Sequence, residues 1–114
     1  MDEPLIALAV DGRLTHHRVG CVRGWQRRLR PWPGRRPPAG SCGVWLARCR
    51  GGLGLGHEAD LAFLAADGTV LQVRSRQPPW RPAWCRGARS ALVLRPGALE
   101  RLGLRAGACL DLLA

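Results

Sequence analysis

The stretch from Gln77 to Arg89, QPPWRPAWCRGAR, contains two tryptophans, three arginines and a cysteine. Trp80 and Trp84 lie four residues apart among arginines, and this combination suits stacking against flat ligands and attraction of anions. The three prolines of the stretch favour an extended backbone. The pattern predicts a rigid crossing between two strands whose tryptophans cover an edge of the core, with a binding edge and a nucleic-acid contact as alternatives.

Cys85 is the candidate nucleophile of this stretch, because a neighbouring arginine favours the reactive thiolate form. Cysteine catalysis also needs a base and a group that orients the base. An enzymatic alternative would require an exposed Cys85 within hydrogen-bond reach of His57, which is distant in sequence. The residues indicate no complete catalytic set, so we expect a non-catalytic protein.

Metal and cofactor chemistry finds little support in the sequence. The adjacent His16 and His17 alternate along a predicted strand and should point to opposite faces. No finger or ribbon spacing relates the histidines to the cysteines, so we expect no metal site and no cofactor. The odd number of cysteines favours free thiols. The five cysteines, none in a CxxC pair, are Cys21, Cys42, Cys49, Cys85 and Cys109.

The glycine-rich run GGLGLG at residues 51–56 has the composition of a phosphate-binding loop. A dinucleotide fingerprint must follow a strand and open a helix, and a P-loop must end in Lys followed by Ser or Thr. Here the run leads into HEADLAFL, which has the pattern of a strand, and the chain contains no lysine. We therefore interpret the run as a flexible or bulged β connection.

The chain carries 18 basic residues, all arginine, against 8 acidic ones, for a formal net charge of +10. Phosphate-binding proteins use lysine as well as arginine, so the absence of lysine indicates a compositional bias. Ten arginines and no acid lie between Arg13 and Arg50, which predicts either a basic face or an ordinary solvated surface. Non-specific nucleic-acid binding is the alternative function, with contacts expected from Arg27, Arg28, Arg30, Arg35 and Arg36.

Short apolar runs separated by turn residues predict six or seven strands. Asp11-Gly12 marks a two-residue hairpin turn, and Asp67-Gly68 marks the turn between two later strands. Two short helices are expected, one within residues 20–30 and one after Pro96 that ends near Gly103. Cys109, in the last strand, is expected to be a small buried residue. The strands are predicted at residues 4–10, 13–19, 43–49, 61–64, 69–76, 90–95 and 106–114.

These elements predict a mostly β protein, a compact sandwich or barrel, without regular βαβ alternation. A length of 114 residues fits a single domain over 1–114 that can fold without metals or disulfides. Residues 31–41, PWPGRRPPAGS, are expected to form an irregular loop. Asp2 and Glu3 stand where a secretory signal carries positive charge, and no apolar run could span a membrane, so we expect a cytoplasmic protein.

Asp60 opens the strand that runs to Leu64 and should share a face with Ala62, opposite Leu61 and Phe63. If both faces are covered, its carboxylate must be paired or hydrogen-bonded, because an unpartnered buried charge costs several kcal/mol. Arg81 and the backbone amides of the strand edge are the two partners that the sequence leaves open.

Three segments carry specific motifs: ADLAFLAADGTVLQV, PPWRPAWCRGA, and the ending L-x-L-x-P-G-x-x-x-R-L-G-L-x-x-G-x-x-L-x-L. Over residues 19–113 the chain resembles the uncharacterised domain-of-unknown-function family one-nine-two, small bacterial and archaeal proteins with a β-sandwich-like fold. Asp60 matches the strand aspartate of that family, and Gly97 and Gly107 match the glycines that bracket its terminal helix. The family's turn and its proline-tryptophan-arginine crossing correspond to Asp67-Gly68 and Pro79-Trp80-Arg81.

The chain also departs from that family. Gly51, Leu55 and Val93 stand where members carry a histidine, a methionine and a glutamate. If those three residues build a polar site in the family, this chain lacks them. Pro31-Trp32-Pro33 also replaces the family's Gly-Leu-Leu. The resemblance therefore implies a fold and brings no established activity.

We expect a small non-catalytic module that binds a protein partner or a small ligand. An acidic protein surface, or a ligand held in a cleft beside Asp60 and Trp80, would suit the arginine-rich chain. The candidate ligand-binding residues are Asp60, Trp80, Arg81 and Trp84.

Overall fold

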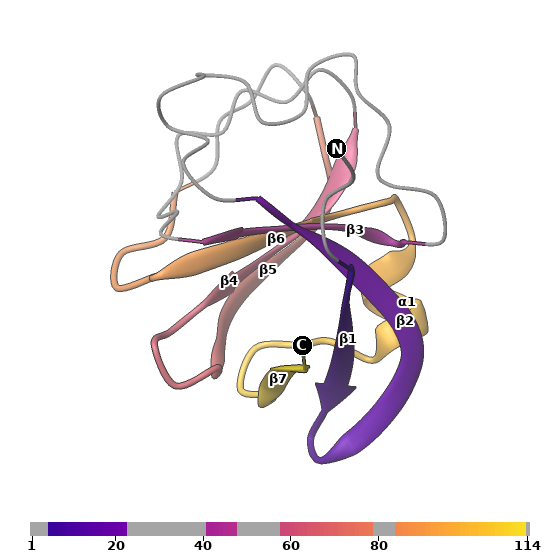
Figure 1. The fold of residues 1–114 in the computed structure, drawn as a ribbon. Coiled ribbons are helices and arrows are strands. Elements are labelled where there is room, and N and C mark those ends of the chain that lie inside the picture. Colours follow the sequence, from indigo (N-terminus) through magenta and orange to yellow (C-terminus); the bar gives the residue numbers. More distant parts are fainter. Residues whose placement is uncertain (1–4, 23–40, 48–57, 79–83, 114) are drawn as a thin grey trace.

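The computed structural model describes residues 5–22, 41–47, 58–78 and 84–113 (Figure 1). The predicted strands are confirmed within these ranges, and the protein has the mostly β class that the sequence indicates. Seven strands and one short helix follow each other as β1 (Leu5–Val10), β2 (Arg13–Val22), β3 (Gly43–Ala47), β4 (Ala59–Leu64), β5 (Val70–Gln77), β6 (Ser90–Leu94), α1 (Ala98–Leu102) and β7 (Leu110–Leu113).

All seven strands belong to one sheet, in the order β5-β4-β6-β3-β2-β1-β7. Neighbouring strands are antiparallel except β2 and β3, which pair in parallel from Val19 opposite Gly43 onward. The sheet curls strongly, and its two outermost strands approach each other at one end (Figure 1). An isolated bridge joins Thr69 to Cys109, and no ladder between β5 and β7 closes the sheet in the described part of the chain.

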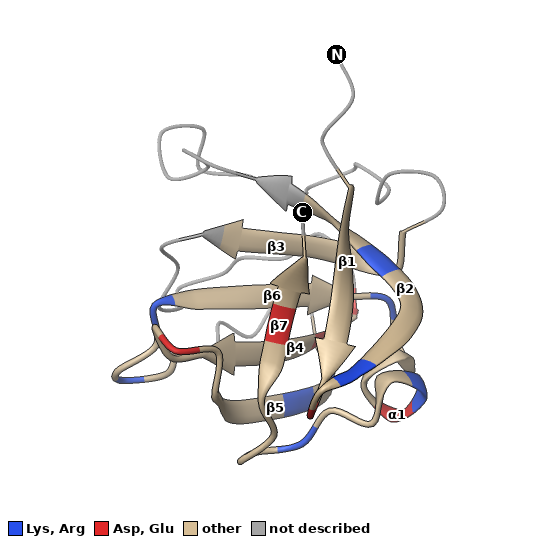
Figure 2. Ribbon diagram, turned by 60° about the horizontal axis from the view of Figure 1, so that its bottom comes forward, with Lys and Arg blue, Asp and Glu red and all other residues tan. Residues whose placement is uncertain are grey.

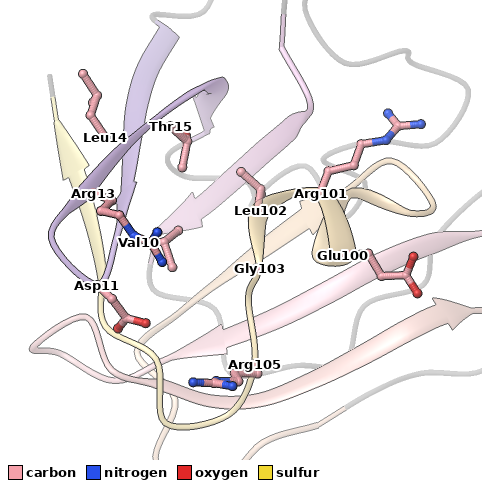
Figure 3. Close-up of a pocket in the computed structure, with 10 residues that line it drawn as sticks. All are labelled: Val10, Asp11, Arg13, Leu14, Thr15, Glu100, Arg101, Leu102, Gly103 and Arg105. Carbon is pink, nitrogen blue, oxygen red and sulfur yellow. The ribbon is translucent and has the colours of Figure 1, made fainter.

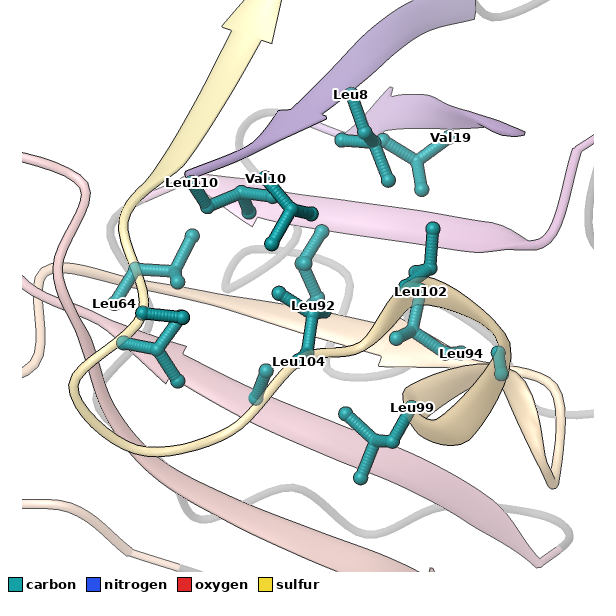
Figure 4. Close-up of a cluster of buried hydrophobic side chains, with 14 residues drawn as sticks. Leu8, Val10, Val19, Leu64, Leu92, Leu94, Leu99, Leu102, Leu104 and Leu110 are labelled. Atoms are coloured by element: carbon teal, nitrogen blue, oxygen red, sulfur yellow. The ribbon is translucent and has the colours of Figure 1, made fainter. Parts of the chain in front are cut away.

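The curled sheet has a buried cluster on each side, which we call the inner and the outer cluster. β4 and β6 are buried along their whole length, because they contribute to both clusters in alternation. Figure 4 shows the inner cluster filling the space enclosed by the sheet, with Leu99 and Leu102 of α1 packed into it. The outer cluster consists of Val44, Leu46, Ala59, Leu61, Phe63, Ala88, Ala91 and Val93.

The turn chemistry expected from the sequence is present. Asp11 and Gly12 both have positive φ, 51° and 82°, as the tight turn between β1 and β2 requires. Gly68 has φ 93°, and a Cβ atom at this position would collide with the carbonyl oxygen of Leu110. A glycine is therefore needed where β5 and β7 meet.

Two expectations fail. The helix predicted from Gly20 is wrong at its start, since Gly20 to Val22 belong to β2, where pairing with β1 and β3 satisfies the backbone. Cys109 is exposed rather than buried, because the residues on either side of it, Ala108 and Leu110, face the inner cluster.

Of the predicted loops, residues 31–40 and 51–56 lie outside the described residues. None of the described helices has the length and apolar character needed to cross a bilayer.

Candidate functional site

Asp60 is fully buried on the inner side of β4, on the face that Ala62 and Leu64 share, as predicted. Its Oδ1 accepts a hydrogen bond from the backbone N–H of Arg76 at 2.8 Å. Its Oδ2 accepts from the N–H groups of Gly97 at 3.0 Å and Leu99 at 3.1 Å. Backbone amides are thus the partners that the structure gives this carboxylate, while Arg81 lies outside the described residues.

The three amides belong to two irregular pieces of backbone. Arg76 has φ 52° and lies where the β4–β5 register shifts between Ala59 and Leu61. Gly97, with φ 90°, precedes the first residue of α1. The buried carboxylate therefore holds a bulge of β5 and the start of α1 at fixed positions relative to β4. This role is a positioning one, and the predicted ligand contact of Asp60 stays a prediction.

A groove of about 490 Å³ lies between the β1–β2 turn and the end of α1 (Figure 3). Its walls carry three arginines and two acids, and its apolar side chains are those of Val10, Leu14 and Leu102, of which Val10 and Leu102 also belong to the inner cluster. In the described part of the chain the sole ion pair joins Arg76 to Glu58, so the arginines of the groove have no carboxylate partner there. The lining residues are Val10, Asp11, Arg13, Leu14, Thr15, Glu100, Arg101, Leu102, Gly103 and Arg105.

Hydrogen bonds fix the wall of the groove opposite α1. Asp11 Oδ1 accepts from the N–H of Cys109 at 2.8 Å, and the N–H of Asp11 donates to the carbonyl of Cys109 at 2.8 Å. The Thr15 hydroxyl donates to the carbonyl of Leu8 at 2.8 Å. The β1–β2 turn is therefore tied to the start of β7, and Asp60 ties α1 to β4.

Residues Trp84 to Arg89, which we call the Trp84 turn, directly precede β6 and lie against the outer cluster. The side chains of Cys85 and Ala88 point toward the sheet and pack on the outer cluster. The N–H of Ala88 donates to the carbonyl of Cys85 at 3.3 Å, and the N–H of Arg89 donates to the carbonyl of Leu64 at 2.8 Å. The backbone of the turn is thus fixed, while Trp84, Arg86 and Arg89 are exposed.

The side chain of Trp84 is 65 % exposed. The prediction that both tryptophans cover a core edge is therefore wrong for Trp84, because the smaller Cys85 and Ala88 fill the adjacent space on the outer cluster. Asp60 and the Trp84 turn lie at opposite ends of β4, since the turn is joined to Leu64. The structure does not bring these two parts of the predicted ligand site together.

The remaining predicted residues divide between those the structure describes and those it does not. His16 is exposed and His17 half-buried, as expected for opposite faces of β2. The described residues include no group of three or more histidine, cysteine or acidic side chains suited to a metal ion. Of the ten arginines from Arg13 to Arg50, the described ranges include Arg13 and Arg18. Outside them lie Trp80, Arg81, His57, Arg27, Arg28, Arg30, Arg35 and Arg36.

Among the described residues, two side chains have a shifted pKa. Burial raises the pKa of the Cys42 thiol, although its own backbone hydrogen bond and the charge of Arg95 act in the opposite direction. Hydrogen bonds from the backbone and side chain of Thr69 lower the pKa of Asp67, whose Oδ1 lies 2.9 Å from the Thr69 N atom. The Asp67 bond closes the β4–β5 turn, and Cys42 directly precedes β3. Both pKa shifts therefore arise from contacts that hold the sheet together.

Sequence reasoning missed the groove. Arg13 follows a hairpin turn, and Arg105 follows α1, so the two residues are far apart in the chain. The local pattern around each arginine is that of an ordinary exposed residue. Only the curl of the sheet, which brings the β1–β2 turn beside α1, places them in one hollow.

Comparison with known proteins finds two solved structures with this fold. One, from Sinorhizobium meliloti 1021, is described as a "putative transcription regulator"; it has a TM-score of 0.78 and 20% identity, covering 98% of this chain and 96% of that chain. The other, from Novosphingobium aromaticivorans DSM 12444, is described as a protein of unknown function. Its TM-score is 0.75 and its identity 17%, covering 94% of this chain and 84% of that chain.

At these identities the likeness shows a shared fold and nothing about activity. No family model and no curated protein matches the sequence. The resemblance to family one-nine-two therefore stays a prediction. The chain is a small β domain whose fold also occurs in these two solved structures.

Proposed function

We propose that this domain is a non-catalytic module that binds an acidic protein segment through the Trp84 turn. The observation that carries the proposal is an indole ring 65 % exposed on a turn whose backbone is fixed at Cys85, Ala88 and Arg89. A large ring on a mobile segment would lose conformational freedom on binding. A ring on a fixed turn has already lost most of that freedom, which favours binding.

The surroundings of the ring suit an acidic partner. Arg86 and Arg89 are exposed on the same turn, and within the described ranges no carboxylate lies within ion-pair distance of either. Tryptophan and arginine are the residues most enriched among those that dominate protein–protein binding energies. An acidic segment with apolar side chains would place its carboxylates on the guanidinium groups and its apolar groups on the indole.

Single-stranded nucleic acid is the second candidate, because a tryptophan beside arginines can also stack on a base and neutralise phosphates. In Figure 2 the described arginines are spread over strands, turns and α1. Nucleic-acid binding needs many phosphate contacts, whereas the Trp84 turn carries two described arginines, so we favour the acidic protein segment.

A binding experiment separates the two candidates. Fluorescence anisotropy would compare a short labelled peptide of alternating glutamate and leucine with a labelled oligothymidylate, each at several salt concentrations. The peptide should bind, and Trp84→Ala should weaken its binding roughly thirtyfold, as truncation of a central interface tryptophan does. Arg18→Gln, which removes an exposed arginine of β2, serves as the matched control and should change the peptide affinity little.

Each result decides the proposal. Peptide binding that Trp84→Ala leaves unchanged would exclude the Trp84 turn as the binding surface. Oligothymidylate binding with a steep loss of affinity on added salt, together with no peptide binding, would support the nucleic-acid candidate instead. If neither probe binds at low salt, the proposed function is wrong.

A further inference from the structure

We propose that the groove between the β1–β2 turn and α1 is a separate binding site for a small anion that also carries a hydroxyl group. The class comprises hydroxy acids and sugar phosphates, which share a carboxylate or phosphoryl group beside a hydrogen-bond donor. The groove shares no residue with the Trp84 turn, and the inference does not depend on the function proposed for that turn.

Two guanidinium groups provide the anion contact. Arg13 stands on the wall formed by the β1–β2 turn, and Arg105 stands beyond α1 on the opposite side (Figure 3). Figure 3 also shows Arg101 and Glu100 directed away from Arg13, Asp11 and Arg105. Guanidinium groups bind carboxylate and phosphoryl oxygens by paired, charge-assisted hydrogen bonds, so an anion between Arg13 and Arg105 would meet donors from both walls.

The carboxylate of Asp11 is the reason why the ligand must carry a hydroxyl group. Its Oδ1 already accepts from the N–H of Cys109, and within the described ranges its Oδ2 has no hydrogen-bond donor. A bare anion would be repelled by this carboxylate. A ligand hydroxyl directed at Oδ2 would turn that repulsion into a hydrogen bond, so the groove should select anions that carry a donor.

The dimensions and stiffness of the groove fit a small molecule. About 490 Å³ lies within the range of small-molecule pockets, and the exposed Leu14, beside Val10 and Leu102, offers an apolar surface for a carbon skeleton. Both walls are fixed before any ligand arrives. Asp60 holds the start of α1, and the Asp11–Cys109 hydrogen bonds hold the β1–β2 turn. A preformed groove needs little ordering on binding, which favours affinity for a small ligand.

The test is a nuclear magnetic resonance titration of the whole chain, following backbone amides and arginine Nε–H signals. Malate and succinate form one pair of probes, and glycerol 3-phosphate and propyl phosphate form the other. Within each pair the first probe carries hydroxyl groups that the second lacks, and the two pairs distinguish carboxylates from phosphate esters. Malate or glycerol 3-phosphate should shift the signals of residues 11–15 and 102–105 saturably, and more strongly than its partner.

Single substitutions test which side chains of the groove contact the ligand. Arg13→Gln and Arg105→Gln should each weaken binding about tenfold, the equivalent of one charge-assisted hydrogen bond. Asp11→Asn keeps an oxygen that can accept from Cys109 N–H, so the turn should stay intact while the preference for malate over succinate falls toward none. Arg18→Gln removes an exposed arginine of β2 that does not line the groove; it is the matched control and should leave the titration unchanged.

Three results would overturn the inference. They are the absence of saturable shifts with all four probes, equal losses in Arg18→Gln and Arg13→Gln, and equal binding of malate and succinate to the unmodified chain. A failed titration in a chain that still binds the acidic peptide through Trp84 would refute the groove alone. Loss of peptide binding with an intact titration would refute the proposed function alone.

Discussion

The Asp60 carboxylate offers the sharpest test of how this fold is held together. Asn has the same shape as Asp but only one acceptor oxygen, whereas Asp60 accepts from three backbone amides. If the Asn oxygen faces Gly97 and Leu99, its amino group faces the N–H of Arg76, and two donors then meet. The reverse orientation leaves two backbone donors without an acceptor. Asp60→Asn therefore loses at least one hydrogen bond in either orientation.

The size of the loss follows from these bonds. A hydrogen bond to a charged group contributes about 1.5–3 kcal/mol, and a buried donor left without a partner costs about 1–3 kcal/mol. Asn is easier to bury than a carboxylate, which offsets part of the cost. We expect Asp60→Asn to lower the free energy of unfolding by about 2–4 kcal/mol. For a chain of 114 residues this corresponds to a drop in Tm of roughly 10 °C.

Urea unfolding followed by circular dichroism would measure the change. Asp111→Asn, at an exposed position of β7, is the matched control and should cost less than about 0.5 kcal/mol. A cost for Asp60→Asn no greater than that of the control would refute the role of the three amides. Combining it with Arg81→Met tests the other partner that the sequence left open. Additive losses would agree with the amides, and recovered stability would indicate an Asp60–Arg81 ion pair.

Two further predictions concern the sheet junction and the thiols. Gly68→Ala should destabilise the fold by more than about 2 kcal/mol, since its Cβ would collide with the Leu110 carbonyl, whereas Gly87→Ala, with similar positive φ and open space, should cost only about 1 kcal/mol. Equal urea midpoints for the two variants would contradict the close approach of β5 and β7. In alkylation with iodoacetamide mapped by mass spectrometry, the exposed Cys109 should react well before Cys42, because burial raises the pKa of the Cys42 thiol and shields it. Faster modification of Cys42 would show that its burial is not maintained in solution.

Local sequence signals predicted much of the framework because the responsible interactions are local. Asp11-Gly12 forms the expected turn since both residues adopt positive φ, and Gly103 ends α1 in the left-handed conformation typical of a helix end. The alternation that put Asp60 on the inner face depends only on the two-residue period of a strand. These features require no knowledge of what the rest of the chain does.

The exposure of Cys109 shows where local reasoning ends. The strand pattern around it suggested a buried residue, but burial depends on which partner a strand meets. Here the neighbouring Ala108 and Leu110 occupy the inner cluster, and Cys109 is left outside, paired with Thr69 through the isolated bridge. A residue next to a strand end can face either side, and packing against a distant segment decides which.

The sequence by itself determined the strands, the tight turns, the short helix and the face on which Asp60 lies. Tertiary structure alone decided the strand order, the parallel pairing of β2 with β3 and the partners of Asp60, which are 16, 37 and 39 residues away. It also decided the groove, whose arginines come from opposite ends of the described chain. The physical reason is the same in each case. Backbone conformation follows from neighbouring residues, whereas a carboxylate, a groove or a sheet edge finds its partners only when distant segments pack together.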